Sequence, residues 1–152
     1  MKEFSQDKQA RLLELLSQEL AIFKQILSLT GNQAEKLDTD DVEALEESLA
    51  QRQELIEKIN GLHQETEVLM QSYIAFRGAA GGKSIAGIES AMEELRTVVA
   101  ECATLNEKNI TAAKGKNEDY VERAGKLNLG RKSLGAYAQN VPYNSELFDK
   151  KT

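Results

Sequence analysis

The most restrictive feature of this 152-residue chain is the spacing of its apolar residues, which recur every three or four positions over long segments. In residues 5–37 the steps along one seam are 4, 4, 3, 4, 3, 4 and 3. Its members are Leu12, Leu16, Leu20, Phe23, Leu27, Thr30, Ala34 and Leu37. This period predicts a helix, and no segment alternates as a strand would. Further apolar residues widen the stripe, so we expect this helix to contact two neighbours.

Two further segments show the same period. The second covers residues 40–76 and follows an acidic turn in which Asp40 is the predicted N-cap and Glu43 its capping-box partner. The third covers residues 84–128 after a glycine-rich stretch, with Ser84 as its predicted cap. The short connections require antiparallel neighbours. The sequence therefore predicts an all-α fold of three long antiparallel helices with coiled-coil-like packing.

The last 24 residues differ in composition from the rest. Residues 129–152 contain several residues that oppose a regular helix, namely Gly130, Gly135, Asn140, Pro142 and Asn144. We therefore expect one helical domain over residues 1–128, followed by a flexible tail over residues 129–152.

Composition excludes several classes of function. With a single histidine, His63, and a single cysteine, Cys102, no Cys/His zinc site can form, and we expect no metal or cofactor. A net charge of −6 argues against nucleic acid as the partner. The longest uncharged stretch, residues 133–145, is too short and polar for membrane insertion, and the N-terminus lacks the apolar core of a signal peptide. We expect a cytoplasmic protein.

Three features resemble chemical sites but fit structural roles better. Residues 81–84 read Gly-Gly-Lys-Ser, yet a phosphate-binding loop would need glycine at Arg77 and a preceding strand. A turn between helices is the better interpretation. His63 and Cys102 lie on or near helix seams and are interpreted as core residues.

Arg52 is the strongest candidate for an enzymatic residue. It falls on an otherwise apolar seam, and helical-bundle enzymes of the mutase kind hold carboxylate substrates with core arginines. The competing interpretation, which we favour, is a side chain that extends to solvent and pairs with an acid one turn away. We expect no enzymatic activity.

The C-terminal third contains apolar residues in a segment too rich in glycine to bury them by itself. Such residues are typical of partner binding, because the partner supplies the burial. The candidate partner-binding residues are Ile110, Tyr120, Leu127, Leu129, Leu134 and Tyr137.

Several segments resemble the FlgN family of flagellar export chaperones. The Asp-bearing turn and helix start at residues 37–45, followed by Arg-Gln-Glu-Leu-Ile at 52–56, resemble that family's first helix pair. Residues 105–109, Leu-Asn-Glu-Lys-Asn, are similar to its third helix, and the Gly-rich tail with Tyr137 to its C-terminus. The likeness covers roughly residues 10–137.

The resemblance implies a non-enzymatic cytosolic chaperone for the hook-filament junction (hook-associated) proteins. Such a chaperone binds the C-terminal helices of its clients, prevents premature assembly and delivers them to the flagellar export gate. Two alternatives remain at this stage. One is a structural coiled-coil or adaptor protein that forms a homo-oligomer through its seams without a client, and the other is a small mutase-like enzyme centred on Arg52.

Overall fold

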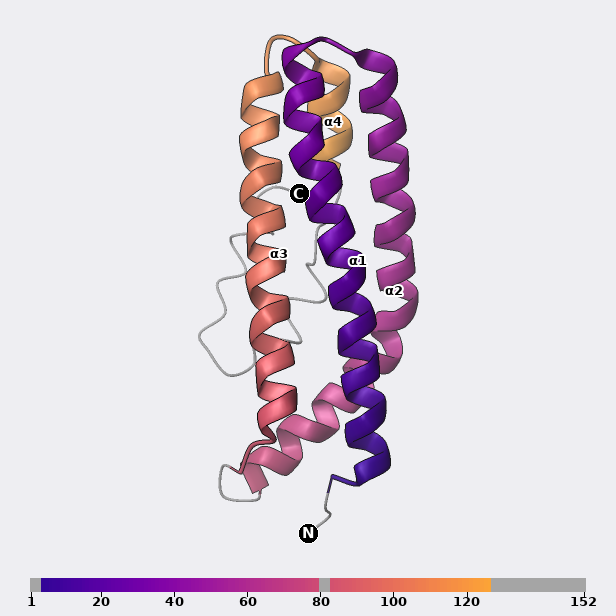
Figure 1. Cartoon of the computed structure of the whole chain (residues 1–152), viewed down its shortest axis with the longest axis vertical. Coiled ribbons are helices and arrows are strands. Elements are labelled where there is room, and N and C mark those ends of the chain that lie inside the picture. Colours follow the sequence, from indigo (N-terminus) through magenta and orange to yellow (C-terminus); the bar gives the residue numbers. More distant parts are fainter. Residues whose placement is uncertain (1–3, 80–82, 127–152) are drawn as a thin grey trace.

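The computed structural model describes residues 4–79 and 83–126, which form four helices and no strand (Figure 1). These are α1 (Gln6–Asp38), α2 (Val42–Ala79), α3 (Ala86–Ala113) and α4 (Glu118–Lys126). α2 runs antiparallel to both α1 and α3, and α1 contacts both α2 and α3, as its wide apolar stripe predicts. The all-α prediction is confirmed. The expected count of three helices is wrong, because a fourth is present.

The apolar seams form the core. Buried residues of α1, α2 and α3 make one long apolar cluster, which includes Phe23, Met70 and Met92. Burying each of these side chains contributes roughly 1.5–3 kcal/mol to the stability of the fold. Because the apolar seams run along three long helices, this burial favours an elongated bundle. Val42, by contrast, is 58% exposed. It is the first residue of α2 and lies beyond the end of the packed seam.

The turn between α1 and α2 differs from its prediction by one residue. Asp40 does not cap α2; it adopts a left-handed conformation with φ of 56°. It follows the C-terminal cap of α1, where the Asp41 amide donates to the Lys36 carbonyl at 3.1 Å in the Schellman pattern. The side chain of Asp41 instead accepts from the Ala44 amide at 3.1 Å. Asp41 is therefore the N-cap of α2.

The predicted third helix is interrupted. A continuous helix over residues 84–128 is wrong, since α3 ends at Ala113 and α4 begins at Glu118. Gly115, with φ of +83°, provides the reversal, and Asn117 caps the new helix by accepting from the Tyr120 amide at 3.0 Å. The break lets α4 turn back and pack against α3 and α2 (Figure 1).

The start of α3 also has an unexpected cap. Ser84 makes no capping bond; Ile85 occupies the N-cap position, and its amide donates to the Tyr73 hydroxyl at 2.9 Å. The same hydroxyl donates to Glu89 in the first turn of α3. The ring of Tyr73 contacts Phe4, with ring centroids 5.5 Å apart, so this end of the bundle is closed by an aromatic cluster.

α2 bends along its length, so that its last turns cross behind α1 and reach the start of α3 (Figure 1). At the opposite end, α4 occupies the space between α2 and α3. No helix among the described residues is both long and apolar enough to cross a membrane. The predicted tail, residues 129–152, lies outside the described residues.

Candidate partner-binding site

A cluster of hydrogen-bonded polar side chains lies inside the bundle at the level of α4. We call it the polar layer, and all four helices contribute to it. Its members are Thr30 and Gln33 of α1, Ser48 and Arg52 of α2, Asn109 of α3 and Tyr120 of α4, all buried. Because buried polar groups are costly unless hydrogen-bonded, this layer fixes how the four helices fit together.

Arg52 is the centre of the layer and corrects the expectation of a solvent-exposed, acid-paired side chain. It is fully buried, and its Nη1 donates to Thr30 Oγ1 and to Gln33 Oε1, both at 3.1 Å. Among the described residues, no carboxylate pairs with it, and Nε and Nη2 have no hydrogen-bond partner. Burial lowers the pKa of the guanidinium, which the nearby Tyr120 partly offsets.

Gln33 connects the layer to α4. Its Oε1 accepts from both Arg52 and the Tyr120 hydroxyl, the latter at 2.7 Å, while its Nε2 donates to Ser48 Oγ at 3.0 Å. The Tyr120 side chain is buried in these contacts, and its predicted role in partner binding stays a prediction. The four-residue break before α4 turns the ring inward. Burial raises the pKa of Tyr120, and the neighbouring Arg52 opposes that rise.

A second apolar cluster lies around the polar layer, separate from the long core. It joins α1, α2 and α3 to α4 through Leu37, Leu45, Leu49, Ala113, Tyr120 and Ala124. Besides Tyr120, α4 is held by Asn106, whose Nδ2 donates to the Ala124 carbonyl at 3.4 Å, and by the exposed ion pair of Arg123 with Glu46 at 3.2 Å. Exposed ion pairs contribute at most about 1 kcal/mol each. The burial of Tyr120 and Ala124 therefore supplies most of the stabilisation that keeps α4 on the bundle.

The other predicted partner-binding residues divide into two groups. Ile110 is half-buried at the edge of the second apolar cluster, beside Val121 of α4. The remaining four, Leu127, Leu129, Leu134 and Tyr137, lie outside the described residues. Gly81 and Gly82 of the Gly-Gly-Lys-Ser segment also lie outside; the described residues on either side show a helix, not a strand, leading into it.

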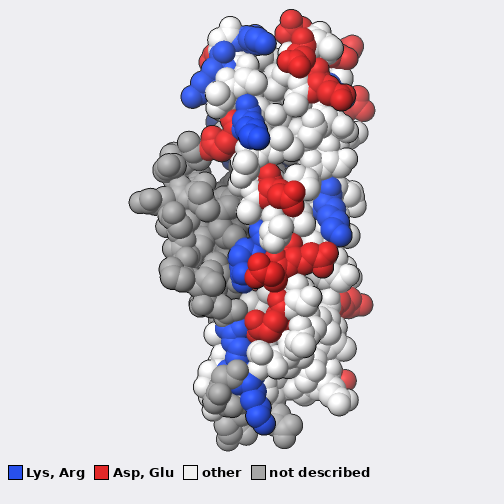
Figure 2. All heavy atoms as spheres, turned by 60° about the vertical axis from the view of Figure 1, so that its left-hand side comes forward, with Lys and Arg blue, Asp and Glu red and all other residues white. Residues whose placement is uncertain are grey.

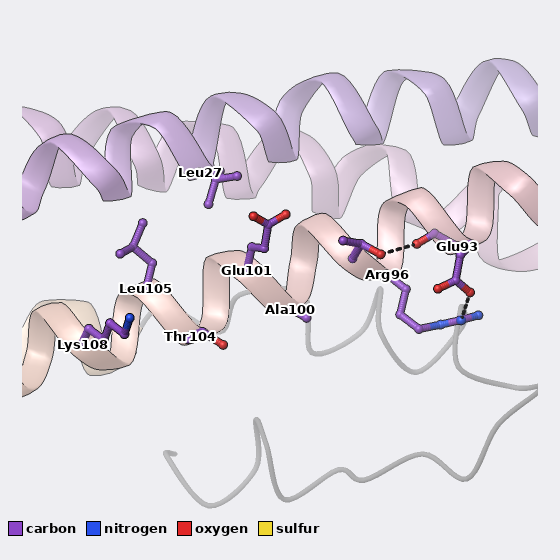
Figure 3. A pocket seen from close by; sticks show the side chains of 9 residues that line it. Leu27, Glu93, Arg96, Ala100, Glu101, Thr104, Leu105 and Lys108 are labelled. Carbon is purple, nitrogen blue, oxygen red and sulfur yellow. Dashed lines mark hydrogen bonds and ion pairs between the residues drawn. The ribbon is translucent and has the colours of Figure 1, made fainter.

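A shallow groove runs along the outer face of α3 beside α1, with a volume of about 600 Å³ (Figure 3). Leu27 and Leu105 face each other across it, and Ala100 and Thr104 provide small side chains along α3. Charged residues line it as well, including Glu93, which pairs with Arg96 at 2.5 Å. Charged side chains flank much of the groove, so we regard it as a weaker candidate than the second apolar cluster.

His63 and Cys102 are buried, as interpreted. His63 Nδ1 lies 3.5 Å from the buried Glu19 Oε1, which links α2 to α1. The Cys102 thiol lies 3.6 Å from the Phe23 carbonyl, and burial raises the pKa of Cys102 to about 12. A thiol with so high a pKa is almost entirely protonated at neutral pH and is a poor nucleophile.

Residues 1–128 match the profile of the FlgN protein family. The chain belongs to the FlgN family. This family comprises flagellar export chaperones, so the chain is a member of a chaperone family that acts in flagellum biogenesis and type III protein export. No curated protein and no solved structure gives a significant match to the chain.

The FlgN match spans every described helix, including α4 and the polar layer. On the face shown in Figure 2, the acidic and basic side chains of the described residues are interspersed.

Proposed function

We propose that this chain is a cytosolic chaperone for the hook-filament junction proteins of the flagellum. It binds their C-terminal helices, which prevents premature assembly, and delivers them to the export gate. Binding acts by mass action, because a bound client helix is withdrawn from self-assembly. The observation that carries the proposal is the FlgN family match over residues 1–128.

We place the client helix at the end of the bundle that contains α4. Leu37, Leu45 and Leu49 are buried there beneath α4, and Ile110 is half-buried at the edge of the same cluster. A helix that lays its apolar face on this cluster would gain burial from α1, α2 and α3 together. We also propose that Leu127, which directly follows α4 in the sequence, contacts the client helix.

The client experiment uses the full chain and a peptide that contains the C-terminal helix of a hook-filament junction protein. Ile110→Glu should weaken binding by about tenfold, because a carboxylate would be placed in an apolar contact. Ala100→Arg, which obstructs the groove on α3, should leave affinity unchanged. If Ala100→Arg abolishes binding and Ile110→Glu does not, the client site is the groove and our placement is wrong.

Ile110 also contacts the second apolar cluster, so its variant needs a check of folding. We expect Ile110→Glu to keep the helical circular dichroism of the parent with a somewhat lower melting temperature. An exposed alanine on α2, Ala50, offers a matched control for the arginine substitution. Ala50→Arg should alter neither affinity nor stability.

The tail completes the proposal. Tyr137 is an aromatic residue near Arg131 and Lys132, a combination suited to transient docking on a larger surface. We propose that this surface is the export gate. Tyr137→Ala should therefore keep client affinity and reduce gate affinity and export. A variant that binds the gate as tightly as the parent would contradict this role.

The adaptor alternative makes a different prediction. A structural adaptor would form a stable homo-oligomer and bind no client peptide. Light scattering after size exclusion, with and without the client peptide, distinguishes the two. A complex with client and chaperone in fixed ratio supports the chaperone, whereas a client-independent oligomer supports the adaptor.

A further inference from the structure

The polar layer contains a cation without a counter-charge. Arg52 is fully buried; its Nη1 donates to the neutral oxygens of Thr30 and Gln33, and the Tyr120 side chain also interacts with the guanidinium. The donors left over are Nε and Nη2, which have no partner among the described residues. A buried charge is destabilising unless it is paired, so this edge of the guanidinium keeps two donors available to a ligand.

The geometry of the two unused donors indicates what would fill that position. Nε–H and one Nη2–H lie parallel on the same edge of a guanidinium. A carboxylate binds that edge with both oxygens, in the bidentate arrangement that makes such pairs strong and specific. A single hydroxyl or amide oxygen would satisfy only one of the two donors.

α4 is the element best suited to give way to such a ligand. It has nine residues, fewer than the roughly 12–15 that a helix needs to be even marginally stable in water by itself. Its contact with the layer is the Tyr120 hydroxyl, which shares the acceptor Gln33 Oε1 with Arg52. Removing α4 would uncover Arg52 together with the apolar residues Leu45 and Leu49 of the second cluster.

We propose that α4 holds the place of the client helix, and that Arg52 selects this helix by pairing with an Asp or Glu on its buried face. The inference rests on the proposed function and adds a chemical rule for the client. The incoming helix needs apolar residues for the second cluster and one acid on the same face. A client with an amide or an apolar residue at that position would leave Nε and Nη2 unsatisfied, as α4 does.

The decisive experiment is a mutant cycle between the full chain and a client peptide. Each acid in the C-terminal helix peptide of a hook-filament junction protein is replaced in turn by its amide, Asp→Asn or Glu→Gln. One of these changes should weaken binding to the parent chain at least about tenfold, the cost of losing a buried charge-assisted pair. The same change should alter binding to Arg52→Met by less than about twofold.

Arg11→Met is the matched control. Arg11 is exposed at the far end of α1 and pairs with Glu65 at 2.6 Å. This variant should discriminate the peptides as the parent does. If every acid-to-amide change weakens peptide binding equally in the parent and in Arg52→Met, Arg52 does not recognise an acid of the client helix, and the inference is wrong.

Hydrogen exchange tests the displacement of α4 separately. When the peptide binds, amides in residues 118–126 should exchange faster while those of α3 become more protected. Protection of α4 that is unchanged in the complex would overturn the displacement.

A parent chain that binds no such peptide would contradict the proposed function. The displacement would then be judged in the free chain, where α4 should exchange at least about tenfold faster than the middle of α3. Equal rates would overturn it. Failure of the proposed function and failure of this inference thus give different results.

Discussion

The guanidinium of Arg52 is a buried positive charge. Among the described residues, its hydrogen bonds go to the neutral oxygens of Thr30 and Gln33. The energetic consequence is that this side chain costs stability. Its partners keep other bonds if it is removed, because Thr30 Oγ1 still donates to the Ile26 carbonyl at 2.7 Å and Gln33 Oε1 still accepts from Tyr120. Stability of the fold therefore does not explain why an arginine occupies this position.

Arg52→Met should raise the free energy of unfolding by about 1–3 kcal/mol, since methionine fills a similar volume without a buried charge. Urea unfolding followed by circular dichroism measures the change. A loss of more than about 1 kcal/mol would show that the layer needs its cation to hold the helices together.

Cys102 gives a prediction for alkaline pH. The folded-state pKa is about 12, whereas an unfolded cysteine ionises near 8.5 to 9. The unfolded chain thus loses this proton first, so stability should fall as pH rises from about 9 toward 12, by about 2 kcal/mol from this group at pH 11. In Cys102→Ala the decline between pH 9 and 11 should be shallower by that amount. Parallel profiles for the two proteins would contradict the assignment.

The sequence predicts such residues only in part. Thr30 and Cys102 lie on or near seams that the apolar period predicts, and both are buried. The hydrogen bonds that they make were not predictable, because a period identifies the buried face but not the side chains it meets. Arg52 was misjudged for the same reason: its seam position was evident, but the oxygens of α1 that receive it were not.

At the scale of helices, the residues in the connections indicate where one helix ends and the next begins, which the apolar period does not show. Gly115 and Asn117 are a stop signal and an N-cap, and Glu118 and Asp119 suit the first turn of a new helix. These signals were present in the sequence. The apolar spacing of Tyr120 and Ala124 with α3 obscured them, because a break of four residues is close to one helical turn and preserves the phase of the pattern.

The α1–α2 turn offers a test with two adjacent aspartates. Asp41→Ala should destabilise the chain by about 1 kcal/mol, because the Ala44 amide loses its cap. Asp40→Gly should cause no loss, and can add up to about 1 kcal/mol, because glycine adopts a φ of 56° without steric cost. Thermal unfolding of both variants checks the contrast. Equal losses would mean that Asp40 also caps the helix.

At the scale of the whole molecule, the candidate site depends on how four helices are rotated about their axes. Gln33 shows why this lay beyond sequence analysis. It is off the predicted seam of its helix, yet it contacts Ser48, Arg52 and Tyr120. Only the combined packing of α2 and α4 against α1 turns that position inward, so the site exists only in the assembled bundle.

This convergence predicts strong non-additivity within the layer. Gln33→Leu alone should cost about 2–4 kcal/mol, since the Tyr120 hydroxyl loses its acceptor and Arg52 keeps only Thr30. Adding Arg52→Met and Tyr120→Phe removes the guanidinium and the hydroxyl that Gln33→Leu deprives of their shared acceptor. The triple variant should therefore recover the parent's free energy of unfolding or exceed it. Urea unfolding of the single, double and triple variants measures the interaction free energy among Gln33, Arg52 and Tyr120. If the three single-variant changes in the free energy of unfolding simply add, the side chains do not act as one network, and α4 is held by its apolar contacts alone.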